Sequence, residues 1–93
     1  MQRPPVLPDT EIQRRLAVLP GWERQGNALR RTFTFRGFPE AVEFIRSMVG
    51  PAETLQHHPD VDLRYDRVLV SLSTHDQGGI TALDFDLAAR LGP

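Results

Sequence analysis

Cysteine is absent from this sequence of 93 residues. Its absence excludes disulfide bonds, thiolate metal ligands and a cysteine nucleophile, and it is compatible with the reducing cytoplasm, where we expect the protein to reside. No run approaches the roughly 20 apolar residues required to cross a bilayer. Residues 1–8 contain three prolines and no apolar stretch, so we expect an extended lead-in there and not a secretory signal. The sequence predicts no membrane association.

An excess of one charge is also lacking. Eleven Lys and Arg residues stand against 12 Asp and Glu residues, for a formal net charge of −1. This balance argues against direct nucleic-acid binding. The sequence contains no glycine-rich phosphate loop, no GxSxG elbow and no HExxH motif. Its adjacent histidines do not have the i, i+4 spacing of a helical zinc site, so we expect no metal.

The composition is that of a globular protein, with 40% hydrophobic and 25% charged residues. A chain of this length is long enough for one domain, which we place at residues 1–93. Its isolated core would be modest in size. Association of subunits would therefore add to its stability.

Two helices are expected in the first part of the chain. The first begins near residues 9–10, where Thr10 and Gln13 have capping-box spacing, and it stops at Pro20. The second is long, and Gly50-Pro51 predicts a kink within one helix rather than two separate helices. Its apolar residues recur with a period of 3.6; they are Phe38, Ala41, Val42, Ile45, Met48, Val49, Ala52 and Leu55.

Alternating residues predict two hairpins. The first joins residues 22–24 to 28–35, and Arg31 on its apolar face suggests an edge position or an interface partner. The second joins 60–65 to 68–73 through a turn at Asp66-Arg67. A last helix follows Thr81. The expected fold is α+β, a two-layer sandwich of a four-stranded antiparallel sheet with three helices on one face, in the order α-β-β-α-β-β-α.

The histidines are the strongest candidates for chemistry. His57 and His58 lie at the end of the long helix, and Glu53 precedes His57 by four residues, so the two side chains can meet on one helix face. A carboxylate there would orient the imidazole and favour its protonated form, as a general acid requires. On these residues alone, interaction of a histidine with the helix dipole is the commoner role. His75 lies in a loop able to approach the pair, or is an ordinary exposed side chain.

Asp84 has a structural explanation of its own. With Thr81 as the N-cap of the last helix, Asp84 occupies the third helical position, where a capping box places its carboxylate. On local grounds capping is the more common role, and it does not exclude a functional one.

The joint spacing of these residues resembles that of the pterin-4a-carbinolamine dehydratase family, also known as the dimerisation cofactor of a homeodomain transcription factor. The pattern runs from Glu53 through three residues to His57-His58-Pro59. The aromatic Tyr65 follows after five residues, His75 after nine more and Asp84 after eight more. The resemblance extends over nearly the whole chain, from residue 9 to residue 91.

This resemblance implies a hydro-lyase that dehydrates 4a-hydroxytetrahydropterin to quinonoid dihydropterin during tetrahydropterin recycling, with no cofactor and no metal. It implies that His57, His58, His75 and Asp84 line one pterin pocket, and that Glu53 supports His57 as the main general acid. His58 and His75 would position the hydroxyl or relay protons, and Asp84 would contact the ring edge or orient a histidine. The expected substrate-binding or orienting residues are Glu53, Pro59, Ser73, Thr74 and Asp84.

The resemblance also implies partners. We expect a homodimer that extends the sheet across subunits. A tetramer would form through the long helix, and the bend at Gly50-Pro51 argues against it. A pterin-dependent hydroxylase or another protein is an expected partner. The alternative function is a non-catalytic assembly or regulatory module on the same scaffold.

Overall fold

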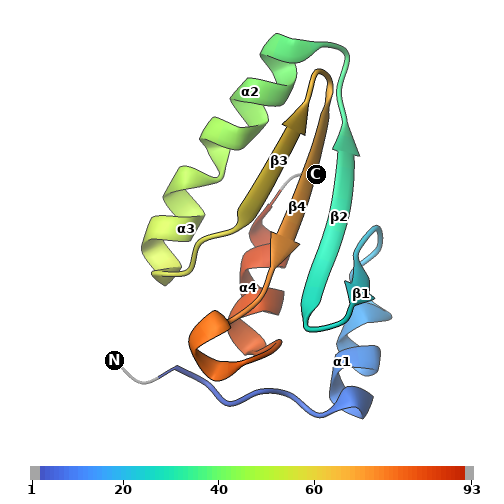
Figure 1. Cartoon of the computed structure of the whole chain (residues 1–93), viewed down its shortest axis with the longest axis vertical. Coiled ribbons are helices and arrows are strands. Elements are labelled where there is room, and N and C mark those ends of the chain that lie inside the picture. The colour runs from blue at the N-terminus through green and yellow to red at the C-terminus, as the bar shows by residue number, and fades with distance from the viewer. Residues whose placement is uncertain (1–2, 92–93) are drawn as a thin grey trace.

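The computed structural model describes residues 3–91 of the chain, in which three helical stretches alternate with two hairpins (Figure 1). In chain order the elements are α1 (Asp9–Leu16), β1 (Glu23–Gln25), β2 (Ala28–Thr34), α2 (Phe38–Ser47), α3 (Val49–Leu55), β3 (Asp60–Arg64), β4 (Arg67–Leu72), the 3-10 helix η1 (His75–Gln77) and α4 (Ala82–Arg90). The predicted α+β order is confirmed, with α2 and α3 in place of the one long helix.

The four strands form one antiparallel sheet in the order β1-β2-β4-β3. The predicted connection at residues 25–27 is one residue too long, because Gln25 pairs with Ala28 and only Gly26 and Asn27 connect β1 to β2. The predicted turn at Asp66-Arg67 is wrong by one residue, because Arg64 pairs with Arg67 and the turn is Tyr65-Asp66. Tyr65 adopts a left-handed conformation, with φ of 52°, and its side chain points to solvent instead of joining the apolar face of β3.

The helices all contribute to one core on one face of the sheet, as predicted. Side chains from β2 and β4 pack against Ile12 of α1, Phe44 of α2 and Leu87 of α4. The ring centroids of Phe33 and Phe44 lie 4.5 Å apart, which joins the sheet to α2. The residues of the sheet that enter this core are Leu29, Phe33, Val68, Val70 and Leu72.

The long helix is divided at Met48. The prediction of one kinked helix is therefore wrong, although α2 and α3 follow each other with only a bend between them (Figure 1). Met48 remains right-handed, and its N–H donates to the carbonyl of Ile45 in a tightened turn. Pro51 then falls in the first turn of α3, where a missing N–H leaves no helical bond unmade.

The start of α1 agrees with the prediction, but its cap differs. The helix begins at Asp9 and follows directly on Pro8, whose carbonyl accepts hydrogen bonds from the N–H groups of Glu11 and Ile12. Thr10 therefore lies inside the helix and is not its cap. Proline in this position favours an extended entry, because its ring fixes φ.

Arg31 is not on an edge strand, since β2 lies between β1 and β4. It does lie just beyond the end of β1, which pairs only with Ala28 to Arg30. Its guanidinium stacks over the ring of Phe33 at 4.3 Å from the centroid. Gly21 permits this packing, because a Cβ there would come within 2.7 Å of the guanidinium.

The end of α3 fixes the backbone that leads into the histidines. Gln56 is left-handed, with φ of 53°. Its N–H donates to the carbonyl of Glu53, and the N–H of His57 donates to the carbonyl of Ala52. These two bonds form a Schellman motif, in which glycine is the residue usually found at the left-handed position. The chain therefore leaves the helix in a defined direction at His57.

Replacing this residue in Gln56→Gly should stabilise the protein. A left-handed conformation costs an ordinary residue roughly 1 kcal/mol that glycine does not pay, so we expect the free energy of unfolding to rise by about 0.5–1 kcal/mol. Urea denaturation would measure it. Thr54→Gly, two residues earlier inside α3, should lower stability instead, because glycine is a poor helix former. A loss of stability in both variants would contradict the proposed strain.

Candidate active site

A buried hydrogen bond joins the end of α3 to the start of α4. His57 is 5% exposed and Asp84 is 0% exposed, and Nε2 of the imidazole lies 2.6 Å from Oδ1 of the carboxylate. Burial of an unpaired carboxylate is very costly, so each group needs the other in this position. The sequence separation of 27 residues is closed by the packing of α3 against α4. Two of the predicted site residues are therefore brought together.

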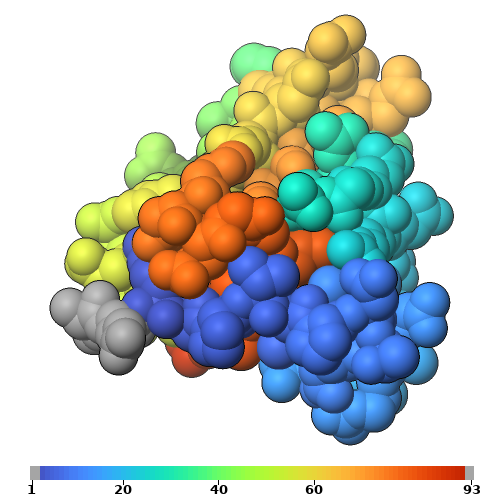
Figure 2. Space-filling model, turned by 60° about the horizontal axis from the view of Figure 1, so that its bottom comes forward, coloured from blue at the N-terminus to red at the C-terminus, as the bar shows by residue number. Residues whose placement is uncertain are grey.

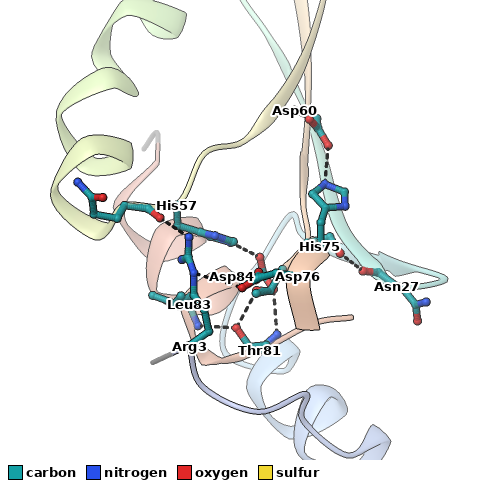
Figure 3. Close-up of polar contacts among 12 residues, drawn as sticks. Arg3, Asn27, His57, Asp60, His75, Asp76, Thr81, Leu83 and Asp84 are labelled. Atoms are coloured by element: carbon teal, nitrogen blue, oxygen red, sulfur yellow. Dashed lines mark hydrogen bonds and ion pairs between the residues drawn. The ribbon is translucent and has the colours of Figure 1, made fainter. Parts of the chain in front are cut away.

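Asp84 is held from its other side by the N-terminus of α4 (Figure 3). Its Oδ2 accepts hydrogen bonds from the N–H of Thr81 and from the hydroxyl of Thr74, each 2.9 Å long. The hydroxyl of Thr81 in turn accepts the N–H of Leu83. The predicted capping box is confirmed. Because the carboxylate bonds His57 through its second oxygen, Asp84 both caps a helix and orients an imidazole.

Glu53 pairs with His58 and not with His57, which corrects the predicted pairing. Nε2 of His58 lies 2.5 Å from Oε2 of Glu53, and both side chains are 64% exposed. The i, i+4 rule fails here because Gln56 leaves the helical conformation before His57 is reached. The turn directs His57 inward to Asp84 and leaves His58 beside α3.

A groove of about 240 Å³ adjoins the Glu53–His58 pair. It runs between the helices α2 and α3 and the strand β3, and its walls are mostly apolar. His58 and Glu53 supply its charged lining, and Pro59 lines it as well. The apolar lining consists of Ile45, Met48, Val49, Ala52 and Val61.

This groove contains only part of the predicted site, and a single pocket shared by His57, His58, His75 and Asp84 stays a prediction. Among the residues that the structure describes, His58 lines the groove, whereas His57 and His75 lie outside it. The physical reason is burial: Asp84 is enclosed by hydrogen-bond partners, and His57 turns toward it.

His75 approaches the segment 57–60 from the loop that follows β4. It begins η1, is 78% exposed, and its Nε2 lies 3.5 Å from Oδ2 of Asp60 (Figure 3). Asp60 was not predicted as a site residue; its place directly after His57-His58-Pro59 was the available signal. The segment 57–60 thus contacts all three partners: His57 bonds Asp84, His58 bonds Glu53 and Asp60 pairs with His75.

Ser73 and Thr74 have structural contacts. The hydroxyl of Ser73 donates to the carbonyl of Asn27 at 2.7 Å and ties the end of β4 to the first hairpin. Thr74 is fully buried against Asp84, so it is placed to orient that carboxylate and not to contact a substrate.

Two features are absent from residues 3–91. No group of three or more His, Cys, Asp or Glu side chains in this range is arranged to hold a metal ion. None of the helices in the same range is long and apolar enough to cross a membrane.

The fold and the site together define a small α+β protein whose imidazole–carboxylate pairs suit general acid–base chemistry. The model of the family described as pterin 4 alpha carbinolamine dehydratase matches residues 5–92, and the chain belongs to this family. The resemblance seen in the sequence is confirmed, and with it the hydro-lyase class of the family.

Curated relatives cover most of the chain. A provisionally named pterin-4-alpha-carbinolamine dehydratase of Roseiflexus castenholzii is 51% identical over 86 residues, which is 92% of each chain. One from a Picosynechococcus strain, also provisionally named, is 49% identical and covers 88% of this chain and 89% of its own.

Two solved structures share the fold. The transcriptional coactivator/pterin dehydratase of Brucella melitensis aligns with a TM-score of 0.86 at 35% identity, over 94% of this chain and 99% of its own. A pterin dehydratase-like protein identified as a RuBisCO assembly factor in the alpha-carboxysome aligns with a TM-score of 0.62 at 22% identity, over 75% and 83%. The second likeness concerns the fold alone.

The variant Asp84→Asn should destabilise the protein although its shape is preserved. It removes the charge that His57, Thr74 and the N–H of Thr81 share, and hydrogen bonds to charged groups are worth about 1.5–3 kcal/mol. We expect the free energy of unfolding, measured by urea denaturation, to fall by about 2–3 kcal/mol.

The matched control is Asp86→Asn, on the same helix. Asp86 forms an exposed ion pair with Arg90, and such pairs contribute about 0.5 kcal/mol or less. Equal losses in the two variants would show that the buried network has no special weight.

Proposed function

We propose that this protein dehydrates a 4a-hydroxytetrahydropterin. In this reaction the bond between C4a and its oxygen breaks, the oxygen takes a proton and leaves as water, and N5–H gives up a proton to form the quinonoid dihydropterin. Membership of the dehydratase family supports the reaction. The observation that carries the proposal is the Glu53–His58 pair at the charged end of an otherwise apolar groove.

His58 is the proposed acid for the leaving hydroxide. It combines solvent access with a place in the groove, whereas His57 is almost fully buried. With Nε2 bonded to Glu53, Nδ1 is the ring nitrogen that would face a substrate. This assignment replaces the Glu53–His57 acid expected from the sequence. A positioned proton donor of this kind contributes roughly 10²–10⁴-fold to a rate.

His75 is the proposed relay for the proton of N5. It pairs with Asp60, whose Cα lies within about 7 Å of that of His58, because two residues of chain reach no further. The proposal requires that one small bicyclic substrate contact both imidazoles. His57 would act indirectly. Its bond to Asp84 fixes the start of the segment 57–60, which includes His58.

The apolar walls of the groove would receive the flat face of the pterin ring. The proposed role in the cell is recycling of the hydroxylated pterin released by a pterin-dependent hydroxylase. We further propose that the protein works as a homodimer.

The variant His58→Ala should lower kcat by about 10²-fold or more, because it removes the proposed acid. Glu53→Gln should lower kcat less, about 10-fold, because the imidazole remains but loses its orienting carboxylate. Stopped-flow absorbance with 4a-hydroxytetrahydropterin would measure both. Glu43→Gln is the control, since Glu43 lies on α2 and pairs with the exposed Arg46. If His58→Ala keeps the wild-type rate, the proposed acid is wrong.

A non-catalytic binding module is the second candidate function. Phe38, Val42 and Val49 are exposed apolar side chains on α2 and α3, which would suit a protein partner. The two functions differ in their response to ligand. A dihydropterin at 100 times its Kd should stabilise the native state of the enzyme by about 2.7 kcal/mol, seen as a rise in Tm. No rise at saturating ligand would favour the binding module.

A further inference from the structure

The segment 3–8 lies against the loop that contains η1. In Figure 2 this N-terminal segment, in blue, runs across the face of the molecule beside the orange segment. The N–H of Leu7 donates to the carbonyl of Ile80 at 2.9 Å. Val6 contacts Gly79, where an added Cβ would come within 3.1 Å of its Cγ1. We refer to residues 3–8 as the strap.

Arg3, within the strap, contacts both segments that carry the candidate histidines (Figure 3). Its guanidinium donates a hydrogen bond of 2.7 Å to the carbonyl of Gln56, the residue before His57. Its Nε lies 3.7 Å from Oδ2 of Asp76, the residue after His75. One planar side chain thus connects the end of α3 to η1.

These two contacts differ in weight. The ion pair with Asp76 is long and exposed, and such pairs contribute little. The bond to Gln56 is short and charge-assisted, which makes it the stronger of the two. It also restrains Gln56, whose left-handed backbone is strained and persists only where the surrounding structure stabilises it.

We propose that the strap, through Arg3, sets the separation of the His57–His58 segment from His75. Arg3 is a positioning residue, since it contacts the carbonyl of Gln56 and the carboxylate of Asp76, which each neighbour a histidine in the chain. This inference rests on the proposed dehydratase function for its kinetic consequence, but its structural consequence stands apart from that function. Misplacing a catalytic group by about 1 Å can cost 10²-fold in rate, so a modest shift of either segment would be visible in kcat.

The main test compares Arg3→Ala with Arg3→Lys and with Arg36→Ala, in which the removed arginine is exposed and pairs with Glu40 on α2. Arg3→Ala should lower kcat by about 10-fold or more, with KM changed much less. Arg3→Lys should recover part of the loss, because lysine keeps the charge without the planar fork. Arg36→Ala should behave as wild type.

A second readout needs no catalysis. In heteronuclear NMR spectra of the substrate-free protein, Arg3→Ala should shift the imidazole resonances of His57 and of His75, and Arg36→Ala should shift neither. Gly79→Ala provides an independent arm, because its methyl group displaces Val6 and should shift the same resonances without touching Arg3.

The outcomes separate the two proposals. Unmoved resonances of both histidines in Arg3→Ala would overturn the positioning role, whatever happens to its Tm. An unchanged kcat in an active enzyme would overturn it as well. If the wild-type protein has no dehydratase activity, the proposed function fails, and shifted resonances would still support the strap.

Discussion

The buried contact between His57 and Asp84 is the interaction on which the site depends. A carboxylate with no solvent exposure is tolerated only because His57, Thr74 and the N–H of Thr81 share its charge. These partners come from the end of α3, the end of β4 and the start of α4. The same contact therefore joins the layers of the fold and fixes the first residue of the segment 57–60.

The other imidazole–carboxylate contacts follow along the same short segment, residues 57–60. The left-handed turn at Gln56 sends His57 inward and leaves His58 with Glu53 at the groove, and Asp60 then meets His75. Each imidazole is thus given a carboxylate, but the degree of burial differs. Because of that difference we propose an orienting role for the buried His57 and a proton-donating role for the exposed His58.

Much of the fold followed from local pattern. Alternation placed both hairpins, and the spacing of Thr81 and Asp84 predicted a capping box that the structure contains. Errors arose where backbone conformation departs from the common one. The second hairpin turn begins one residue earlier than predicted, at the left-handed Tyr65. The predicted long helix is two helices separated at Met48, and not one helix kinked at Pro51. Residue type alone does not predict such local backbone conformations.

The sequence by itself determined the α+β class and indicated the family, the three histidines and two of their carboxylates, Glu53 and Asp84, because periodicity and spacing are properties of the chain; Asp60 was not among them. Only the tertiary structure decided which carboxylate serves which histidine. Glu53 bonds His58, Asp84 bonds His57 and Asp60 meets His75. The contacts of His75 with Asp60 and of His57 with Asp84 join residues that are 15 and 27 positions apart. The contact of His58 with Glu53 depends on the left-handed conformation of Gln56. Packing and backbone direction therefore had to select the partners.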